Sequence, residues 1–191
     1  MLPSSVQKFI KFFSALPGIG PRQATRLAFY IIRSGQETVY NLAKAIADLK
    51  EIKTCPICFY VNSEQCFICN DPMRRKDLVC IIEKETDLIS LEKSKKYNGL
   101  YLILGEIGKT GLLGIEQKLR IASLKNRTPQ LTEIILGINP TAYGDLNVSL
   151  ILQEIKSFAS KITRLGRGLP TGGEIEFADP DTLGGAIDNR S

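Results

Sequence analysis

The chain has 191 residues, of which 43% are hydrophobic and 24% charged, a composition that supports a folded core in a globular protein. No run approaches the roughly 18 apolar residues that span a bilayer, and the first residues lack a signal-peptide pattern, so we expect a cytoplasmic protein without a membrane partner. The net charge of +5 comes almost wholly from residues 1–53, where eight lysines and arginines face three acids. A local basic excess is typical of proteins that bind polyanions.

Three helices are predicted in residues 1–53. The first follows from apolar side chains spaced three and four residues apart, at Val6, Phe9, Ile10 and Phe13. A second helix is expected to begin at Pro21, since proline fits the first helical position, where its missing N–H costs nothing. The third is predicted to run through Val39 to Leu49. The turn between the first two, residues 16–22, reads Leu-Pro-Gly-Ile-Gly-Pro-Arg.

This turn resembles the helix–hairpin–helix motif and favours phosphate binding. Gly18 and Gly20 lack side chains, so backbone N–H groups can approach an anion closely, and the positive end of the following helix points the same way. Arg22 and Arg26 are four residues apart and share one helix face. We therefore expect sequence-nonspecific, salt-sensitive DNA binding. The alternative is a plain packing unit in which the glycines serve only the turn.

Four of the five cysteines form two Cys-x-x-Cys pairs, at Cys55, Cys58, Cys66 and Cys69. Two such pairs supply the four thiolates of a tetrahedral zinc site. The chain contains no histidine, and four thiolates leave no open position for water, so we predict one structural Zn²⁺ and no catalytic metal. Two disulfides of a secreted protein and an iron–sulfur cluster are the alternatives.

From residue 77 onward the pattern changes to short apolar runs separated by helix-like stretches. The runs are 78–82, 100–104, 134–136 and 162–165, and the stretches between them are 85–97, 115–125 and 145–160. Strands that alternate with helices indicate a parallel sheet covered on both faces. Cys80, inside the first run, is expected to be a buried hydrophobic side chain.

A glycine-rich stretch, residues 105–114, contains Gly108-Lys109-Thr110, which matches the last positions of a phosphate-binding loop. The first glycine of that motif would fall at residue 103, where Ile103 lies inside an apolar run. We therefore favour a long loop beside the sheet over a nucleotide site.

The chain resembles the RecR family of bacterial recombination-repair proteins over essentially its whole length. The resemblance rests on residues 16–28, on the four cysteines, on Gly-Ile-Asn-Pro-Thr at 137–141, and on residues 163–179. It implies an α/β protein with an N-terminal all-α helix–hairpin–helix module, a Cys₄ zinc finger and a parallel-sheet Toprim domain. The boundaries expected are 1–53 for DNA binding and assembly, 54–76 for the zinc finger, 77–170 for the Toprim domain and 171–191 for a C-terminal segment.

The Toprim resemblance bears on whether the protein is an enzyme. Catalytic Toprim domains hold Mg²⁺ with a glutamate after the first strand and an Asp-x-Asp after the third. Glu83 stands at the first position, but Asn139-Pro140-Thr141 occupies the second, and Mg²⁺ prefers carboxylates and water to amides. We therefore expect no catalysis. The alternatives are a Mg²⁺-dependent Toprim nuclease or primase-like enzyme that uses Glu83 and Asp145, and a zinc-ribbon interaction protein without DNA contact.

Family resemblance also implies partners. It predicts a homo-oligomer, a dimer or tetramer ring or clamp on nucleoid DNA, that helps RecO, and in some pathways RecF, to load RecA at gaps. Acids of the family near residues 143–145 are implicated in contacting RecO, whereas this chain reads Tyr143-Gly144-Asp145. Glu83, Tyr143 and Asp145 are thus candidate partner-binding residues, with Tyr143 in place of an acid. An alternative role for Asp145 is the N-cap of a helix over 146–160.

Overall fold

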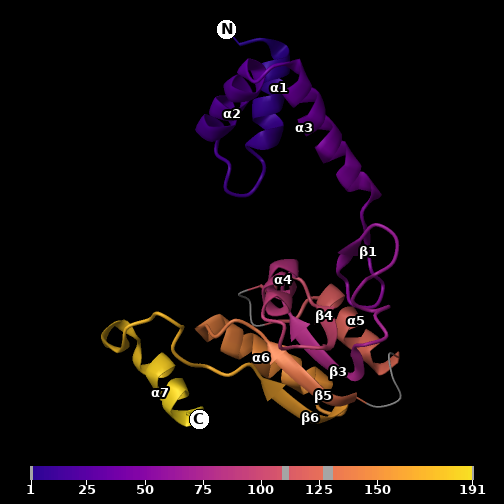
Figure 1. Cartoon of the computed structure of the whole chain (residues 1–191), viewed down its shortest axis with the longest axis vertical. Coiled ribbons are helices and arrows are strands. Elements are labelled where there is room, and N and C mark those ends of the chain that lie inside the picture. The colour runs from indigo at the N-terminus through magenta and orange to yellow at the C-terminus, as the bar shows by residue number, and fades with distance from the viewer. Residues whose placement is uncertain (1, 109–111, 127–130, 191) are drawn as a thin grey trace. The chain divides into compact units, whose positions relative to one another are not determined.

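The computed structural model describes residues 2–108, 112–126 and 131–190. The chain divides into two compact units, Met1–Ile52 and Lys53–Ser191, which are described separately below and drawn together in Figure 1. The fold class predicted from sequence is confirmed, with helices first, then the four cysteines, then a parallel sheet. Lys109 and Thr110, which carry the phosphate-loop resemblance, lie outside the described residues.

The first unit is a small helical hairpin followed by a third helix. Its elements are α1 (Ser4–Phe13), α2 (Pro21–Arg33), α3 (Gln36–Asp48) and a short 3-10 turn, η1 (Leu49–Glu51). Pro21 occupies the first turn of α2, as expected. The buried side chains of α1 and α2 are Val6, Ala24 and Ala28, and α3 buries none. A core this small leaves most of the apolar surface of the unit exposed.

The second unit is built on four parallel strands, which confirms the sequence prediction. They are β3 (Arg75–Ile82), β4 (Gly99–Ile103), β5 (Leu131–Gly137) and β6 (Ala159–Arg164), in the spatial order β4-β3-β5-β6. The last five residues of β3 and all of β4 are buried. Strands that are covered on both faces require continuous apolar runs, and these runs are what the sequence contains.

Helices α4 (Glu85–Lys93), α5 (Ile115–Ala122) and α6 (Ala142–Ile155) connect the strands, with a 3-10 turn, η2 (Ser123–Asn126), after α5. The chain crosses from β3 to β4 in one direction and from β4 through β5 to β6 in the other. Because such crossovers are right-handed, this reversal places α4 on one face and α5 and α6 on the other. Contact between α5 and α6 agrees with that arrangement.

The boundaries of α6 differ from the sequence prediction of 145–160. The helix begins at Ala142 because the Thr141 side chain caps it, accepting a hydrogen bond from the Gly144 N–H at 3.0 Å. Asp145 is therefore not the N-cap but lies inside the first turn. The helix ends at Ile155, and β6 begins at Ala159 after a turn.

A 3-10 turn, η3 (Ile175–Phe177), and a last helix, α7 (Pro180–Asp188), form in the C-terminal segment, where no element was predicted. Asp179 caps α7 by accepting from the Thr182 N–H, and Pro180 occupies the first turn. This Asp-Pro pair is a helix-start signal.

The cysteine segment also contains two short strands, β1 (Lys53–Thr54) and β2 (Val61–Asn62), which pair antiparallel. Three of the cysteines and Ile68 belong to the same buried cluster as the sheet. The segment thus shares the core of the second unit.

Candidate functional sites

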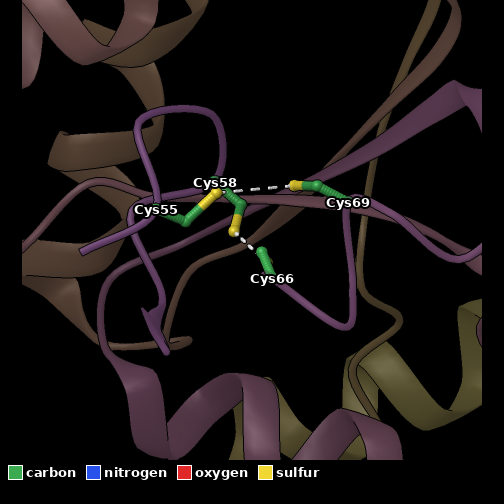
Figure 2. A group of neighbouring side chains, drawn as sticks. All are labelled: Cys55, Cys58, Cys66 and Cys69. Atoms are coloured by element: carbon green, nitrogen blue, oxygen red, sulfur yellow. Dashed lines mark hydrogen bonds between the residues drawn. The ribbon is translucent and has the colours of Figure 1, made fainter. Parts of the chain in front are cut away.

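The four cysteines converge on one point, as Figure 2 shows. Each Cys-x-x-Cys pair lies on a tight turn, closed by hydrogen bonds from Phe59 N–H to the Cys55 carbonyl and from Asn70 N–H to the Cys66 carbonyl, both 3.0 Å. The Sγ atoms of Cys55 and Cys69 are 3.9 Å apart, and those of Cys58 and Cys66 are 3.4 Å apart. All four sulfur atoms lie within 4.8 Å of one another.

These distances fit a tetrahedral metal ion. Four thiolates at the Zn–S length of about 2.3 Å would have sulfur–sulfur separations of about 3.8 Å. A hydrogen bond to Cys69 and burial raise the pKa of Cys58, and repulsion by the neighbouring Cys69 thiolate raises it further. A cation between the sulfur atoms would relieve that repulsion. The Ile57 N–H points at the Cys55 sulfur, 3.4 Å away. Within residues 2–108, 112–126 and 131–190, the four cysteines form the one group of three or more cysteine or carboxylate side chains that lie close enough to bind a metal ion together.

Backbone and core contacts attach the cysteine cluster to the sheet. The carbonyl of Cys58 accepts a 2.9 Å hydrogen bond from the N–H of Ile103, in strand β4 at the edge of the sheet. Ile68, between the second pair of cysteines, is 0% exposed. On the other side, Lys76 Nζ donates to the carbonyls of Cys69 and Asp71, each at 2.8 Å. The cluster therefore covers an edge strand whose polar backbone would otherwise be open.

A polar network strengthens this attachment. The Arg74 guanidinium donates to Glu92 of α4 and, at 3.1 Å, to the Gly99 carbonyl of β4. The buried Tyr101 hydroxyl donates to the same Glu92 carboxylate at 2.6 Å. Burial alone would raise the pKa of Glu92, but the hydrogen bonds from Arg74 and Tyr101 lower it overall. The carboxylate is thus held ionised between two strong donors.

Helix α5 holds the cysteine cluster from a further direction. The Arg120 guanidinium lies over the Phe59 ring, 4.6 Å from its centroid, and donates to the Ile103 carbonyl at 2.9 Å. Phe59 directly follows Cys58 and has a φ of 64°, a left-handed backbone conformation that residues other than glycine rarely adopt. The tight turn around the cysteines imposes this conformation, and the cation over the ring helps to stabilise it.

In the first unit, the structure gathers the predicted DNA-contact residues around the start of α2. Gly18 has a φ of 77°, which only glycine adopts at low cost, and Gly20 occupies the N-cap position without a capping side chain. Arg22 and Arg26 line one open groove of about 840 Å³, together with the exposed Tyr30. The two cations and the aromatic ring therefore lie along one face of α2, and Arg22 places this groove next to the N-terminus of the helix.

Glu83 follows strand β3 and is only 9% exposed. Its carboxylate accepts hydrogen bonds from the side-chain amides of Asn139, at 3.2 Å, and Asn147, at 3.5 Å. These residues line a cavity of about 560 Å³, which Tyr143 also borders. Sequence reasoning found Glu83 and Asn139 but missed Asn147, because its position inside α6 carries no local signal.

Asp145 is not brought to the cavity of Glu83. Its carboxylate Oδ1 instead accepts from Arg164 at 2.6 Å and also from Arg167. The hydrogen bond from Arg164 outweighs burial and lowers the pKa of Asp145. The carboxylates of Glu83 and Asp145 thus accept hydrogen bonds from different sets of side chains and do not form one site. Arg164 and Arg167 were missed as site residues, although both lie within residues 163–179, which carry part of the family resemblance.

The close packing of Gly144 yields a prediction. A Cβ atom at this position would lie 1.8 Å from the carbonyl oxygen of Asn139, so Gly144→Ala must displace the turn that precedes α6. We expect a loss of about 2–3 kcal/mol in the free energy of unfolding, measured by chemical denaturation. The control is Gly184→Ala in α7, where nothing lies within 4 Å and alanine is expected to be neutral or stabilising by up to about 1 kcal/mol. Equal stability of the two variants would contradict the prediction.

Comparison with known proteins agrees with this architecture. Family models match the RecR helix-hairpin-helix at residues 6–50, the Toprim domain at 77–166 and the RecR C-terminal region at 168–191. Relatives named "Recombination protein RecR" include those of Chloroflexus aurantiacus, 37% identical over 100% of this chain and 95% of the relative, and Staphylococcus aureus, 37% identical over 99% and 98%. The relative from Rubrobacter xylanophilus is 40% identical over 97% and 96%.

The fold and sites define a Toprim-containing α/β protein with a helix–hairpin–helix unit and a four-cysteine cluster that fits a metal ion. Its similarity to the relatives above extends over nearly the full length of both chains and identifies one family within this class of proteins. The chain belongs to the RecR family of recombination proteins. None of its described helices is long and apolar enough to cross a membrane.

Proposed function

We propose that this protein is a nonenzymatic DNA-binding factor of recombination repair, which encircles nucleoid DNA in the bacterial cytoplasm and helps RecO, and in some pathways RecF, to load RecA at gaps. The observation that carries the proposal is the groove of Arg22, Arg26 and Tyr30 along α2, in a chain whose relatives are named recombination proteins. Cations and helix N-terminal N–H groups bind phosphates without reading bases.

The Toprim cavity supports a binding role over catalysis. Glu83 is engaged by the amides of Asn139 and Asn147, and Glu106, the other acid that lines the cavity, forms a 2.8 Å ion pair with Lys84. Asp145 is ion-paired with arginines elsewhere. Mg²⁺ requires several oxygen ligands in octahedral geometry, and the two acids that line this cavity, Glu83 and Glu106, both lie beside the Lys84 cation.

We propose one Zn²⁺ per chain at Cys55, Cys58, Cys66 and Cys69. The all-sulfur donor set suits zinc, and four thiolates fill its coordination sphere. The ion would supply structural stability by cancelling the repulsion between the thiolates, and no reaction is assigned to it. The cysteine cluster would then brace the edge strand β4.

Partner binding is proposed at Glu83 and Tyr143, which line the Toprim cavity, and at Asp145, which lies outside this cavity in the first turn of α6. Tyr143 is 53% exposed at the start of α6, beside the buried carboxylate of Glu83. A large aromatic side chain at a cavity rim is well suited to a protein contact. The relevant partner surface on RecO is expected to accept an aromatic ring where family members present an acid.

Assembly into a ring is supported by the apolar face of α3. Val39, Leu42 and Ile46 recur at helical spacing on α3, Leu49 of η1 continues the row, and all four side chains are exposed. Because α3 has no fully buried side chain in its own unit, its apolar face is available for contact with another protein surface. The same apolar face on a second copy of this chain would be a complementary surface. Several linked DNA contacts would then multiply through their effective concentration.

A prediction follows for the mass in solution. The wild-type protein is expected to have a mass that is a multiple of 21.1 kDa, and Leu42→Glu with Ile46→Glu should lower it toward that of one chain, because buried charges oppose association. Light scattering after gel filtration, with and without DNA, measures this. Lys44→Glu, on the same helix, changes the net charge equally and should leave the mass unchanged. A double variant that keeps the wild-type mass would remove α3 from the interface.

The function itself is tested by measuring RecA filament formation on gapped DNA in the presence of RecO, with and without this protein. We expect loading to accelerate when the protein is added. DNA integrity is followed in the same reactions with Mg²⁺ present. Cleavage or synthesis that disappears in Glu83→Gln would contradict the nonenzymatic assignment, and unchanged loading would contradict the repair role.

A further inference from the structure

One carboxylate joins three parts of the second unit. Asp145, in the first turn of α6, accepts hydrogen bonds at the same oxygen, Oδ1, from Arg164 and from Arg167. Arg164 is the last residue of β6, and Arg167 lies three residues further along, where the chain leaves the sheet. The two ion pairs therefore connect the start of α6 to the end of β6 and to the first residues beyond it.

Helix α7 packs on the same arginine. The side-chain amide of Asn189 donates to the Arg167 carbonyl at 3.3 Å. A Cβ atom at Gly185, inside α7, would lie 2.7 Å from the Cβ of Arg167, so the helix backbone approaches this residue directly. Arg167 is thus held from two directions, through its guanidinium by Asp145 and through its backbone by α7.

The charges make Asp145 the critical member of this group. Its side chain is 47% exposed, while those of Arg164 and Arg167 are 24% and 33% exposed. Without the carboxylate, two partly buried guanidinium groups would face each other and repel. Asp87 also lines the cavity of about 290 Å³ beside the two arginines, but its carboxylate binds the N–H of Lys84 at the start of α4. Asp87 is therefore already engaged and does not replace Asp145.

We propose that Asp145 is a positioning residue that, through Arg164 and Arg167, fixes the point at which residues 168–190 leave the sheet and so holds α7 in place. The segment beyond this point presents exposed apolar side chains, among them Ile175, Phe177 and Ile187. Their placement then depends on an ion-pair network at the base of the segment. This role is internal to the chain and does not depend on DNA or RecO binding.

Hydrogen exchange of the full-length protein, resolved along the chain, tests the proposal. In Asp145→Asn we expect amides of residues 181–190 to exchange at least about tenfold faster than in the wild type, while those of β3 and β5 keep their protection. Asp145→Glu retains the carboxylate and should restore slow exchange. Uniformly faster exchange throughout β3 and β5 would mark Asp145 as a general stability residue and overturn the proposal.

Two further variants sharpen the test. Glu176→Gln removes one negative charge from an exposed position in the same segment and should exchange as the wild type does. Arg167→Ala keeps the carbonyl and Cβ that α7 contacts but removes the ion pair, so it should loosen α7 while Asp145 still binds Arg164. Wild-type exchange of α7 in both Arg167→Ala and Asp145→Asn would show that the ion pairs do not position the segment.

Discussion

Replacing Cys58 with serine is expected to prevent stable metal binding and to lower the free energy of unfolding of the second unit by at least about 3 kcal/mol, or roughly 10 °C in Tm. Cys58 is fully buried, and its own carbonyl binds Ile103 in β4. Loss of the metal ion leaves three crowded thiols beside a polar hydroxyl. The effect should therefore reach the sheet edge and not stop at the cysteine turns.

Three measurements check this prediction: metal content by elemental analysis, Tm by calorimetry, and amide exchange at Ile103. The control is Cys80→Ala in β3. Cys80 is buried away from the cluster, and burial raises the pKa of its thiol to about 12. That variant should keep one metal ion per chain and lose only about 1 kcal/mol, as expected for a small cavity.

The same experiment shows whether the cysteine segment stabilises strand β4 or folds independently of the sheet. From sequence alone, removal of the metal is expected to loosen residues 54–76 while the sheet stays folded. The shared core and the Cys58–Ile103 hydrogen bond instead predict that β4 also loses protection. Unchanged exchange at Ile103 after verified metal loss would favour the sequence-based expectation.

The second large effect is expected on DNA affinity. Arg22→Ala combined with Arg26→Ala removes both cations of the α2 groove, so binding should weaken at least about tenfold at moderate salt. Because each lost phosphate contact removes about 0.9 from the slope of log K against log salt, the slope should become flatter by up to about 2 per protomer. Fluorescence anisotropy at several salt concentrations measures both quantities.

A matched control separates this site from nonspecific charge. Lys44→Ala with Lys50→Ala removes two positive charges from α3 and the turn after it, within the same unit. Its binding should fall less, and its salt slope should stay near that of the wild type. If the two double variants behave alike, the hairpin is not the DNA contact, and the basic excess of residues 1–53 acts only as a diffuse field.

Local sequence signals predicted the elements that depend on local chemistry. Strands β3 and β4 could be located because strands buried on both faces need continuous apolar runs, as in Val79–Ile82. Strands β5 and β6 are less completely buried but still contain short apolar runs. The start of α6 was misplaced because both Thr141 and Asp145 are good capping residues, and only the folded turn shows which one accepts the hydrogen bond. Helix α7 was missed because Gly184 and Gly185 weaken its helical pattern.

The parts of the sites that could not be predicted depend on contacts between distant residues. The four-cysteine cluster could be predicted from the sequence, because its members lie within 15 residues at zinc-finger spacing. The hydrogen bonds from Asn139 and Asn147 to Glu83 span 56 and 64 residues. No sequence pattern marks an asparagine as the partner of so distant a carboxylate. The bond between Cys58 and Ile103 uses only backbone atoms, which carry no residue-specific signal at all.

The position of the cysteine cluster in the chain has a consequence for synthesis on the ribosome. All four cysteines precede the first strand of the parallel sheet, β3, and therefore emerge before β4, β5 and β6. All ligands of the proposed zinc site lie at or before Cys69, so zinc binding would not have to wait for the translation of most of the sheet. Once closed, the turn presents the carbonyl of Cys58 as a fixed acceptor for the incoming β4. A nascent chain that acquires its metal early would thus begin its sheet from a protected edge, at the stage when unpaired strands are most exposed to aggregation.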